Sequence, residues 1–338
     1  MKKVKKVLAT CLAALALTAS LGMGACGKEK EDITVYMPDG APALAFAGLM
    51  STDTADDGVS YKVVDATVIT SKISANDMDD NADFCVLPVN VASKRLGSGE
   101  EYQMLGLVTQ GNLYFISNKE VADVDDLSVL TGKTVGLTQI ANVPGLTLKA
   151  ALNRQNVAWS ELKSGTEAAE DKVNLQGLAN GAGIDGSLPY YLAAEPLVTT
   201  MTIGGKFRVV GDLQTLYNGI GSESVGYPQA VLVAKRSFLK KNQAWTSDFL
   251  EKLIESNEWL ATASAQDIYV SIVRHFEDAS HKAVFSVGAL TEDCISRCGI
   301  SFAYAKDCYV RVDEFLAELV TINSNMASAV EKEFYWLG

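Results

Sequence analysis

The chain has 338 residues, a length that suits two domains of ordinary size or one large domain. Hydrophobic residues make up 48% of it and charged residues 21%, which argues against disorder, and no collagen-like or heptad repeat runs through it. The 41 acidic residues outnumber the 29 basic ones, giving a formal charge of -12. No nucleic-acid partner is expected, because phosphate binding needs clustered Lys and Arg.

The N-terminus has the features of an export signal. Four lysines precede an apolar run over residues 7–21, which is shorter than the ~20 residues of a membrane-spanning helix. Small residues then lead to Cys26, and Met-Gly-Ala-Cys-Gly over 23–27 resembles a bacterial lipobox, with Met23 where Leu is usual. We expect residues 1–25 to be a lipoprotein signal peptide and Cys26 to be lipidated. The alternative is an ordinary cleaved signal with an incidental cysteine.

The mature chain is expected to be more acidic than the whole. Removing residues 1–25, which hold four lysines and no acid, leaves 25 basic against 41 acidic residues, a net charge of -16. Such a body is repelled by anionic headgroups, so membrane contact is expected through the acyl chains on Cys26. Residues 26–32 form the expected tether. The expected location is the extracytoplasmic face of the cell membrane.

Four cysteines remain after the signal and the lipidation site: Cys85, Cys294, Cys298 and Cys308. Buried free thiols are the first expectation for them, and one disulfide among the last three is the alternative. No second Cys or His pair stands at zinc-ligand spacing, so no metal and no cofactor are expected.

Strand and helix patterns alternate from residue 33 onward. Residues 33–37 and 59–64 read as strands, and the first of them enters a Pro-Asp-Gly loop and then a helix. A third strand over 84–87 is followed by a helix, and two extended runs over 104–109 and 113–117 come next. This alternation indicates a mostly parallel sheet covered on both faces.

The pattern then restarts. A strand over 133–137 leads through Asn142, a candidate N-cap, to a helix over 145–153. A helix is predicted over 170–179. Further strands are predicted over 188–192, 207–210 and 229–234, and the remainder reads as mostly helical, notably over 245–261.

The sequence therefore predicts an α/β protein of two doubly wound lobes joined by two extended hinge crossovers, with a ligand cleft between them. Lobe 1 is expected over 33–112 and 227–338, where it includes a helical C-terminus, and lobe 2 over 113–226. Ligands of open α/β sheets bind beyond the carboxyl ends of the strands.

Four segments carry a family resemblance: Val-Tyr-Met-Pro-Asp-Gly-Ala-Pro-Ala-Leu over 35–44, Ala-Asp-Phe-Cys-Val-Leu-Pro over 82–88, residues 126–136, and Ala-Glu-Pro over 194–196. With the lipobox they resemble type 2 periplasmic binding proteins. More narrowly, they are similar to the ABC-transporter lipoproteins of the class that contains thiamine-precursor, sulfonate, nitrate and taurine binders.

The resemblance covers roughly residues 33–240. It implies a monomeric substrate-binding protein, not an enzyme, that captures a small ligand by hinge closure and delivers it to an ABC permease. The chain departs from the class after residue 156, because residues 164–167 have weak strand character where relatives have a strand and a ligand-side loop.

The candidate ligand residues of lobe 1 follow its strands. Asp39, Gly40 and Ala41 either form a simple turn or offer backbone N–H groups to the ligand. Asn90 offers both a donor and an acceptor, or else caps a helix. The last two candidates, Gln110 and Asn112, are ligand contacts or hinge spacers.

The lobe 2 candidates are Gln139 and Asn142 after one strand and Glu195 after another, joined by Tyr227 at the second crossover. Glu195 is expected to point into the cleft, and the alternative is a carboxylate stabilised at a helix N-terminus. Tyr227, like Tyr190 and Tyr191, either stacks on a flat ligand or belongs to the core.

None of these loops holds Arg or Lys, which favours a neutral or amine-bearing heterocycle, such as an aminopyrimidine of the thiamine-precursor type, over an anion. The rival functions are an enzyme on the same fold, like the pyrimidine-synthesising or menaquinone-pathway relatives, and a sensor lobe that presents ligand to a receptor. Residues 181–186 spell G-x-G-x-x-G, but no predicted strand precedes them, so the motif is read as fortuitous.

Overall fold

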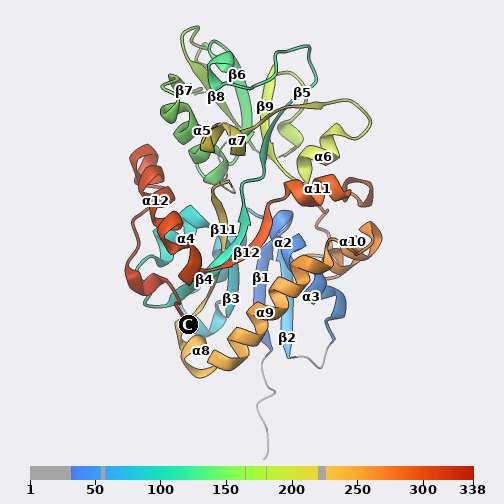
Figure 1. Cartoon of the computed structure of the whole chain (residues 1–338), viewed down its shortest axis with the longest axis vertical. Coiled ribbons are helices and arrows are strands. Elements are labelled where there is room, and N and C mark those ends of the chain that lie inside the picture. The colour runs from blue at the N-terminus through green and yellow to red at the C-terminus, as the bar shows by residue number, and fades with distance from the viewer. Residues whose placement is uncertain (1–31, 55–57, 164, 180, 220–225) are drawn as a thin grey trace, which may run out of the picture.

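The computed structural model describes residues 32–54, 58–163, 165–179, 181–219 and 226–338. Two six-stranded sheets lie end to end along the long axis, each with helices packed on it (Figure 1). This arrangement confirms the predicted α/β fold class with two lobes. The signal peptide, the lipobox and all but the last residue of the tether lie outside the described residues.

The first sheet has the strand order β12 (Ile300–Tyr304), β4 (Tyr102–Gln110), β11 (Pro228–Lys235), β3 (Phe84–Pro88), β1 (Ile33–Pro38), β2 (Val59–Val64). The second has the order β10 (Arg208–Asp212), β5 (Leu113–Ser117), β9 (Tyr190–Ala194), β6 (Thr134–Thr138), β8 (Val173–Leu178), β7 (Trp159–Glu161). The chain crosses from the first sheet to the second between β4 and β5 and returns between β10 and β11. The first sheet therefore combines β1–β4 with β11 and β12, whereas the second contains only β5–β10.

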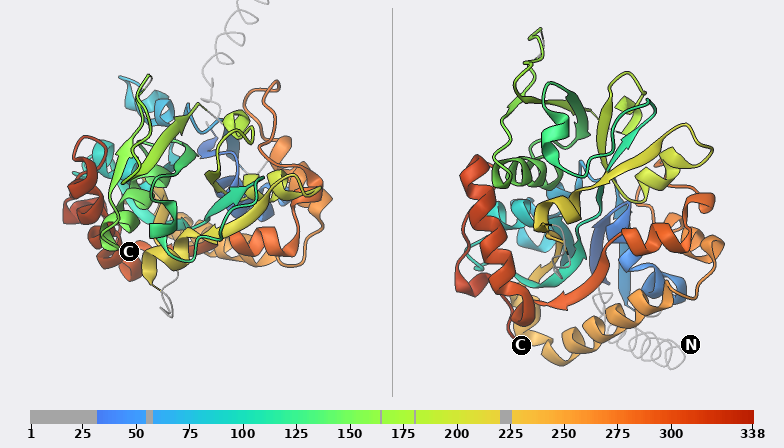
Figure 2. Two further views of the ribbon diagram at one scale, coloured as in Figure 1. Left: turned by 90° about the horizontal axis from the view of Figure 1, so that it is seen from above. Right: turned by 45° about the horizontal axis from the view of Figure 1, so that its top comes forward.

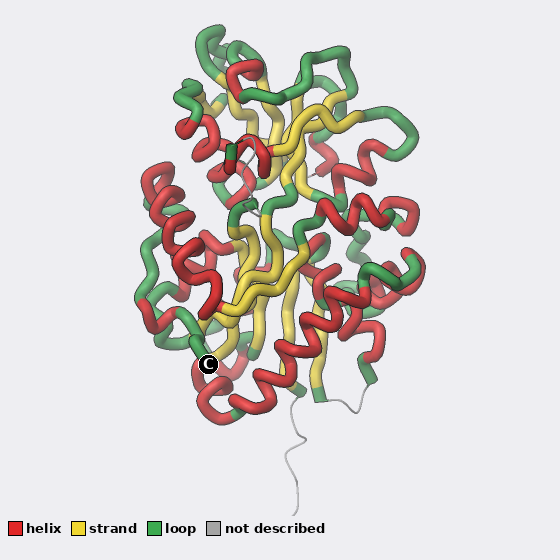
Figure 3. Tube along the Cα trace, in the orientation of Figure 1, coloured by secondary structure: helices red, strands yellow, loops and turns green. Residues whose placement is uncertain are grey.

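Helices cover both sides of the strands (Figure 3). They are α2 (Ala41–Ala45), α3 (Ala47–Thr52), α4 (Val89–Leu96), α5 (Val143–Arg154), α6 (Leu197–Thr202), α7 (Leu213–Asn218), α8 (Arg236–Lys241), α9 (Gln243–Trp259), α10 (Ala265–Val273), α11 (Glu292–Arg297) and α12 (Ala305–Asn323). In β3, Phe84 and Val86 face the core of α2, α3 and α9, whereas Cys85 and Leu87 face the core of α4 and α12. Burial on both faces explains why these strands are continuously apolar.

The sheets are mixed and not mostly parallel as predicted. β1 pairs in parallel with β2 and β3, but β11 pairs antiparallel with both β3 and β4. β11 enters the first sheet from the edge that faces lobe 2, so it must run opposite to β3 and β4, which end at that edge. β5 pairs antiparallel with β9 for the same reason, since it leaves the first sheet at this edge.

Two elements differ from the sequence prediction. The segment read as a helix over 170–179 contains the strand β8, which pairs in parallel with β6 and β7. Val173 and Leu175 are buried at period two, and the buried Asn174 amide binds the backbone of Ala169 through both its atoms at 2.8 Å. The C-terminal part is not wholly helical either, because β12 adds an edge strand to the first sheet.

The strand β8 also corrects the reading of the G-x-G-x-x-G motif. A strand does precede residues 181–186, contrary to the sequence argument, but the described residues 181–186 contain a single 3-10 turn at Gly181–Gly183 and begin no α-helix. A dinucleotide fingerprint needs a helix N-terminus at this point, so the motif remains fortuitous.

Among the described residues, no helix is both long and apolar enough to span a membrane.

Candidate functional site

The carboxyl ends of β1, β3 and β4 lie at one edge of the first sheet. The three strands run the same way, since β1 is parallel to β3, and β11 is antiparallel to both β3 and β4 with Ala230 opposite Pro88 and Thr109. In the second sheet β6 and β9 are parallel, and β9 is antiparallel to β5, so both end where β5 begins. The two edges therefore face each other across the crossovers (Figure 1).

All ten predicted ligand residues lie at or just beyond these facing edges. Asp39, Gly40 and Ala41 follow β1, Asn90 follows β3, and Gln110 and Asn112 lie at the end of β4. Gln139 and Asn142 follow β6, Glu195 follows β9, and Tyr227 precedes β11. Their environments divide them into groups.

The Asp39 carboxylate is engaged by the protein. It accepts hydrogen bonds from the backbone N–H of Gly40 at 2.7 Å and Val284 at 2.9 Å, and lies 3.0 Å from His281 Nε2. Burial raises its pKa above the usual range of an aspartic acid. Gly40 has a φ of 101°, and a Cβ there would lie 3.9 Å from Pro196 of lobe 2. The Asp39 turn therefore shapes a place where the lobes approach closely.

Asn90 and Asn142 meet across the lobes. The Asn90 side chain is fully buried, and its Nδ2 donates to the carbonyl of Met326 at 3.0 Å and to Asn142 Oδ1 at 3.4 Å. Asn142 stands at the N-cap position of α5 as predicted, but its side chain makes no capping hydrogen bond. Its carboxamide faces lobe 1 instead.

Gln139 and Asn112 differ in exposure. Gln139 is exposed and has a φ of 54°, in the left-handed region, which directs the chain from β6 toward α5. Asn112 is buried, and its Nδ2 donates to the Glu195 carbonyl at 3.4 Å while its own carbonyl accepts from Glu195 N–H at 3.0 Å. Asn112 thus ties the first crossover to the end of β9.

Gln110 and Tyr227 belong to the hinge. Gln110 Oε1 accepts a hydrogen bond from Arg311 Nη2 of α12. Tyr227 is fully buried, lies 5.9 Å from Phe315 in a stacked arrangement, and donates through its hydroxyl to Gln214 at 3.0 Å. In this structure Tyr227 is a core residue, which is the alternative that the sequence left open.

Glu195 is the candidate whose environment differs most from expectation. Its carboxylate is fully buried and accepts from Thr199 N–H at 2.9 Å, Thr199 Oγ1 at 3.0 Å and Arg297 Nε at 2.8 Å. Cys294 Sγ lies 3.7 Å from its other oxygen. Glu195 thus has the helix-end role that was the alternative to a cleft-facing carboxylate, and it also forms an ion pair with α11 in lobe 1.

Two cations therefore approach the site from the C-terminal segment, although the predicted loops hold none. Arg297 reaches Glu195 with a side chain that is 34% exposed, and its guanidinium carbon lies 5.6 Å from the Tyr114 ring centroid. Arg311 reaches Gln110. The loops alone gave an incomplete account of the charges at the site, so the absence of cations from them does not by itself exclude an anionic ligand.

Five buried polar atoms at the junction of the lobes have no hydrogen-bond partner among the described residues: Asn90 Oδ1, Asn112 Oδ1, Gln214 Nε2, Gln229 Oε1 and Arg311 Nε. Buried polar atoms are normally paired, because leaving one unpaired costs about 1–3 kcal/mol. This concentration marks the junction as the place where further polar groups would be bound most favourably.

The four cysteines of the described residues are free and buried, as first expected. The hydrogen bond with Cys294 and burial raise the pKa of Cys298 well above its ordinary value. Thiols of this kind are unreactive. No group of His, Cys, Asp and Glu within the described ranges has the arrangement of a metal site.

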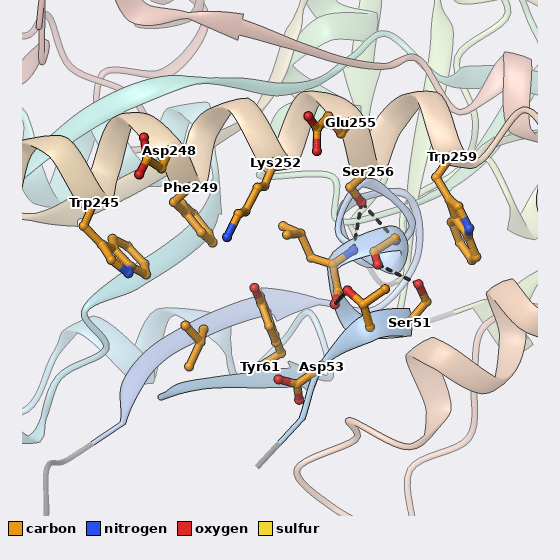
Figure 4. Close-up of a pocket in the computed structure, with 14 residues that line it drawn as sticks. Ser51, Asp53, Tyr61, Trp245, Asp248, Phe249, Lys252, Glu255, Ser256 and Trp259 are labelled. Atoms are coloured by element: carbon orange, nitrogen blue, oxygen red, sulfur yellow. Dashed lines mark hydrogen bonds between the residues drawn. The ribbon is translucent and has the colours of Figure 1, made fainter. Parts of the chain in front are cut away.

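A separate groove of about 520 Å³ lies away from the junction, between α3, β2 and α9 (Figure 4). Tyr61, Phe249 and the ends of α9 at Trp245 and Trp259 line it, and Lys252 extends into it. Ser256 already accepts from Gly48 N–H at 2.9 Å and donates to the Ala45 carbonyl at 3.0 Å. All its lining residues belong to lobe 1, so hinge motion would not enclose a ligand there.

The fold is that of the two-lobed periplasmic binding proteins. A crystal structure described as an ABC transporter from Parabacteroides distasonis matches 90% of this chain and 99% of its own with a TM-score of 0.65 and 19% identity. The aliphatic sulphonate-binding protein SsuA of Escherichia coli matches 90% of this chain and 92% of its own, at a TM-score of 0.61 and 13% identity. A zinc-bound ligand-binding component of an ABC-type import system from Staphylococcus aureus gives 0.59 and 12%, over 90% of this chain and 96% of its own.

In sequence, the chain is similar to YtlA of Bacillus subtilis (strain 168), whose name assigns it provisionally to the binding proteins. The two are 24% identical over 171 residues, so the match spans about half of each, 51% of this chain and 48% of YtlA. No protein-family model matches the chain.

Replacing Glu195 by Gln is expected to lower the free energy of unfolding by about 1–2 kcal/mol, because the ion pair with Arg297 is lost while most of the packing is kept. Urea unfolding measures the loss. The matched control is Asp123→Asn, which breaks an exposed pair with Arg208 and is expected to cost at most about 0.5 kcal/mol. Equal losses in the two variants would show that the buried ion pair of Glu195 contributes no more to stability than an exposed one.

Proposed function

We propose that this chain is an extracytoplasmic solute-binding protein that captures a small polar ligand between its lobes and delivers it to an ABC importer. One observation supports the proposal most strongly. Candidate residues of both lobes lie at the facing edges of the two sheets, and some of their amide groups have no partner among the described residues. The likeness of the fold to ABC-type binding proteins supports it. Anchoring through lipidated Cys26, action as a monomer and the absence of catalysis are parts of the same proposal.

The ligand is proposed to be rich in hydrogen-bond donors. Asn90 Oδ1 and Asn112 Oδ1 are acceptors that no described residue pairs, so N–H groups of a ligand would bind there with a net gain. The aminopyrimidine type suggested by the sequence meets this requirement. The sulfonate group and nitrate carry acceptors only and would rely on the arginines.

A thermal-shift screen tests the proposal. The compounds are thiamine precursors, other aromatic amines, sulfonates and inorganic oxyanions, and a ligand at one hundred times its Kd is expected to stabilise the fold by about 2.7 kcal/mol. We expect amine-bearing heterocycles to raise the Tm and oxyanions to leave it unchanged. Stabilisation by sulfonates or nitrate alone would overturn the ligand class, and stabilisation by none of the compounds would count against solute binding.

A further inference from the structure

We propose that the lobes close on each other in the absence of ligand, held by two ion pairs on opposite sides of the crossovers. This inference rests on the proposed function, since it describes how the same site is regulated. Each pair joins a residue of one lobe to a residue of the other. Figures 1 and 2 place the two helices that supply the lobe 1 partners, α11 and α12, on opposite sides of the molecule.

The first pair is Glu195 of lobe 2 with Arg297 of α11. Arg297 Nη2 lies 2.7 Å from Glu195 Oε1 and donates to Thr199 Oγ1 at 2.8 Å. The Glu195 side chain is fully buried, and the closed state pairs its charge with this arginine in addition to the hydrogen bonds from Thr199. Separation of the lobes would return both charges to water.

The second pair is Arg154 of α5 with Glu318 of α12. It is bidentate, with Arg154 Nε and Nη2 at 2.7 and 2.8 Å from the two carboxylate oxygens. The Tyr217 hydroxyl donates to the same carboxylate at 2.5 Å, and its ring centroid lies 3.9 Å from the Arg154 guanidinium carbon. Bidentate arginine–carboxylate pairs are stronger than ion pairs with a single hydrogen bond.

The closed state also carries a cost at the same junction. Asn90 Oδ1 and Asn112 Oδ1 are buried there without partners among the described residues, whereas in an open form water would reach them. The ion pairs favour closure and the unpaired amides oppose it. A ligand that supplies N–H donors removes the cost, so it selects a closed form that is already populated.

Electron-paramagnetic-resonance distance measurement on the full ligand-free chain tests this inference. Spin labels are placed by Ile203→Cys in lobe 2 and Val310→Cys in lobe 1, two side chains that are 50% and 53% exposed. We expect the parent labelled protein to show mainly one distance, that of the closed structure. Arg297→Gln and Glu318→Ala should each lower the ratio of closed to open protein about tenfold, and a second distance should appear.

Two further variants make the outcome decisive. Arg208→Gln removes the same charge from an ion pair with Asp123 that lies wholly in lobe 2, so its distances should equal those of the parent. If Arg297→Gln fails to fold, the double variant Glu195→Gln with Arg297→Gln leaves no buried charge unpaired and should still open. A parent that is mainly open without ligand, or distances unchanged in both interlobe variants, would overturn the inference. Because no ligand is added, this outcome is independent of the ligand screen.

Discussion

Replacing Gly299 by alanine is expected to lower the free energy of unfolding by about 3 kcal/mol. Gly299 has a φ of 63°, and a Cβ there would lie 1.8 Å from the carbonyl oxygen of Gln110. The Gly299 carbonyl in turn accepts from Gln110 N–H at 2.8 Å. The methyl group must therefore displace the first crossover from the segment that joins α11 to β12. Urea unfolding followed by circular dichroism measures the loss.

The matched control is Gly204→Ala. Gly204 has a φ of 81°, but a Cβ there meets no atom within 4 Å, so only the backbone strain remains. We expect this variant to lose about 1 kcal/mol. If the two glycines cost the same, the crowding at the crossover has no energetic consequence and the described packing of the hinge is wrong.

Removing both unpaired amide acceptors is expected to weaken ligand binding about a hundredfold. Asn90→Ala and Asn112→Ala each delete an acceptor that a donor-rich ligand would engage, and each lost hydrogen bond corresponds to about tenfold in Kd. Isothermal titration calorimetry measures the change with the compound that stabilises the protein most in the thermal-shift screen.

Thr147→Val serves as the control for these variants. Its hydroxyl is also buried without a partner, but Thr147 lies within α5 and not at the facing edges. We expect the affinity of Thr147→Val to equal that of the wild type. An unchanged Kd in the Asn90→Ala, Asn112→Ala double variant would remove these residues from the proposed site.

Much of the fold could be predicted from local sequence signals. In β1 and β2 apolar residues alternate with other residues, β3 is a continuous apolar run, and each strand ends at Pro or before a turn. The alternation of strands and helices along the chain predicted the α/β class. The strand β8 was predicted wrongly as part of a helix, although Val173 and Leu175 alternate with Asn174 and Gln176 as a strand requires. The alternation spans only these four residues before Gly177, and the pairing of β8 with β6 and β7 establishes the strand.

The positions of the candidate residues could also be predicted from the sequence, because the carboxyl ends of parallel strands share one edge of a sheet. The arginines that bind two of these residues could not be predicted. Arg297 lies 102 residues from Glu195 and Arg311 lies 201 residues from Gln110, and no local pattern links them. One signal was present at Arg297: it stands on a short helix between two cysteines that proved fully buried. An arginine next to buried residues is expected to pair with an acid, because a buried charge without a partner is costly.

The structure shows which acidic groups at the junction of the lobes are already paired within the protein. The sequence has an acidic excess, but the acids at the junction, Asp39, Glu195 and Glu318, are all engaged by protein donors. Within the part of the chain that the structure describes, the buried polar atoms left unpaired at the junction are four amide atoms and one guanidinium nitrogen. Ligand recognition is accordingly proposed to depend on hydrogen bonds more than on net charge.

The most direct test of the central claim is a crystal structure of the protein with the compound that stabilises it most. We predict that the compound lies between the facing edges of the two sheets, within hydrogen-bond distance of Asn90 and Asn112, and contacts residues of both lobes. A compound bound in the groove between α3 and α9, or one that touches a single lobe, would contradict the account.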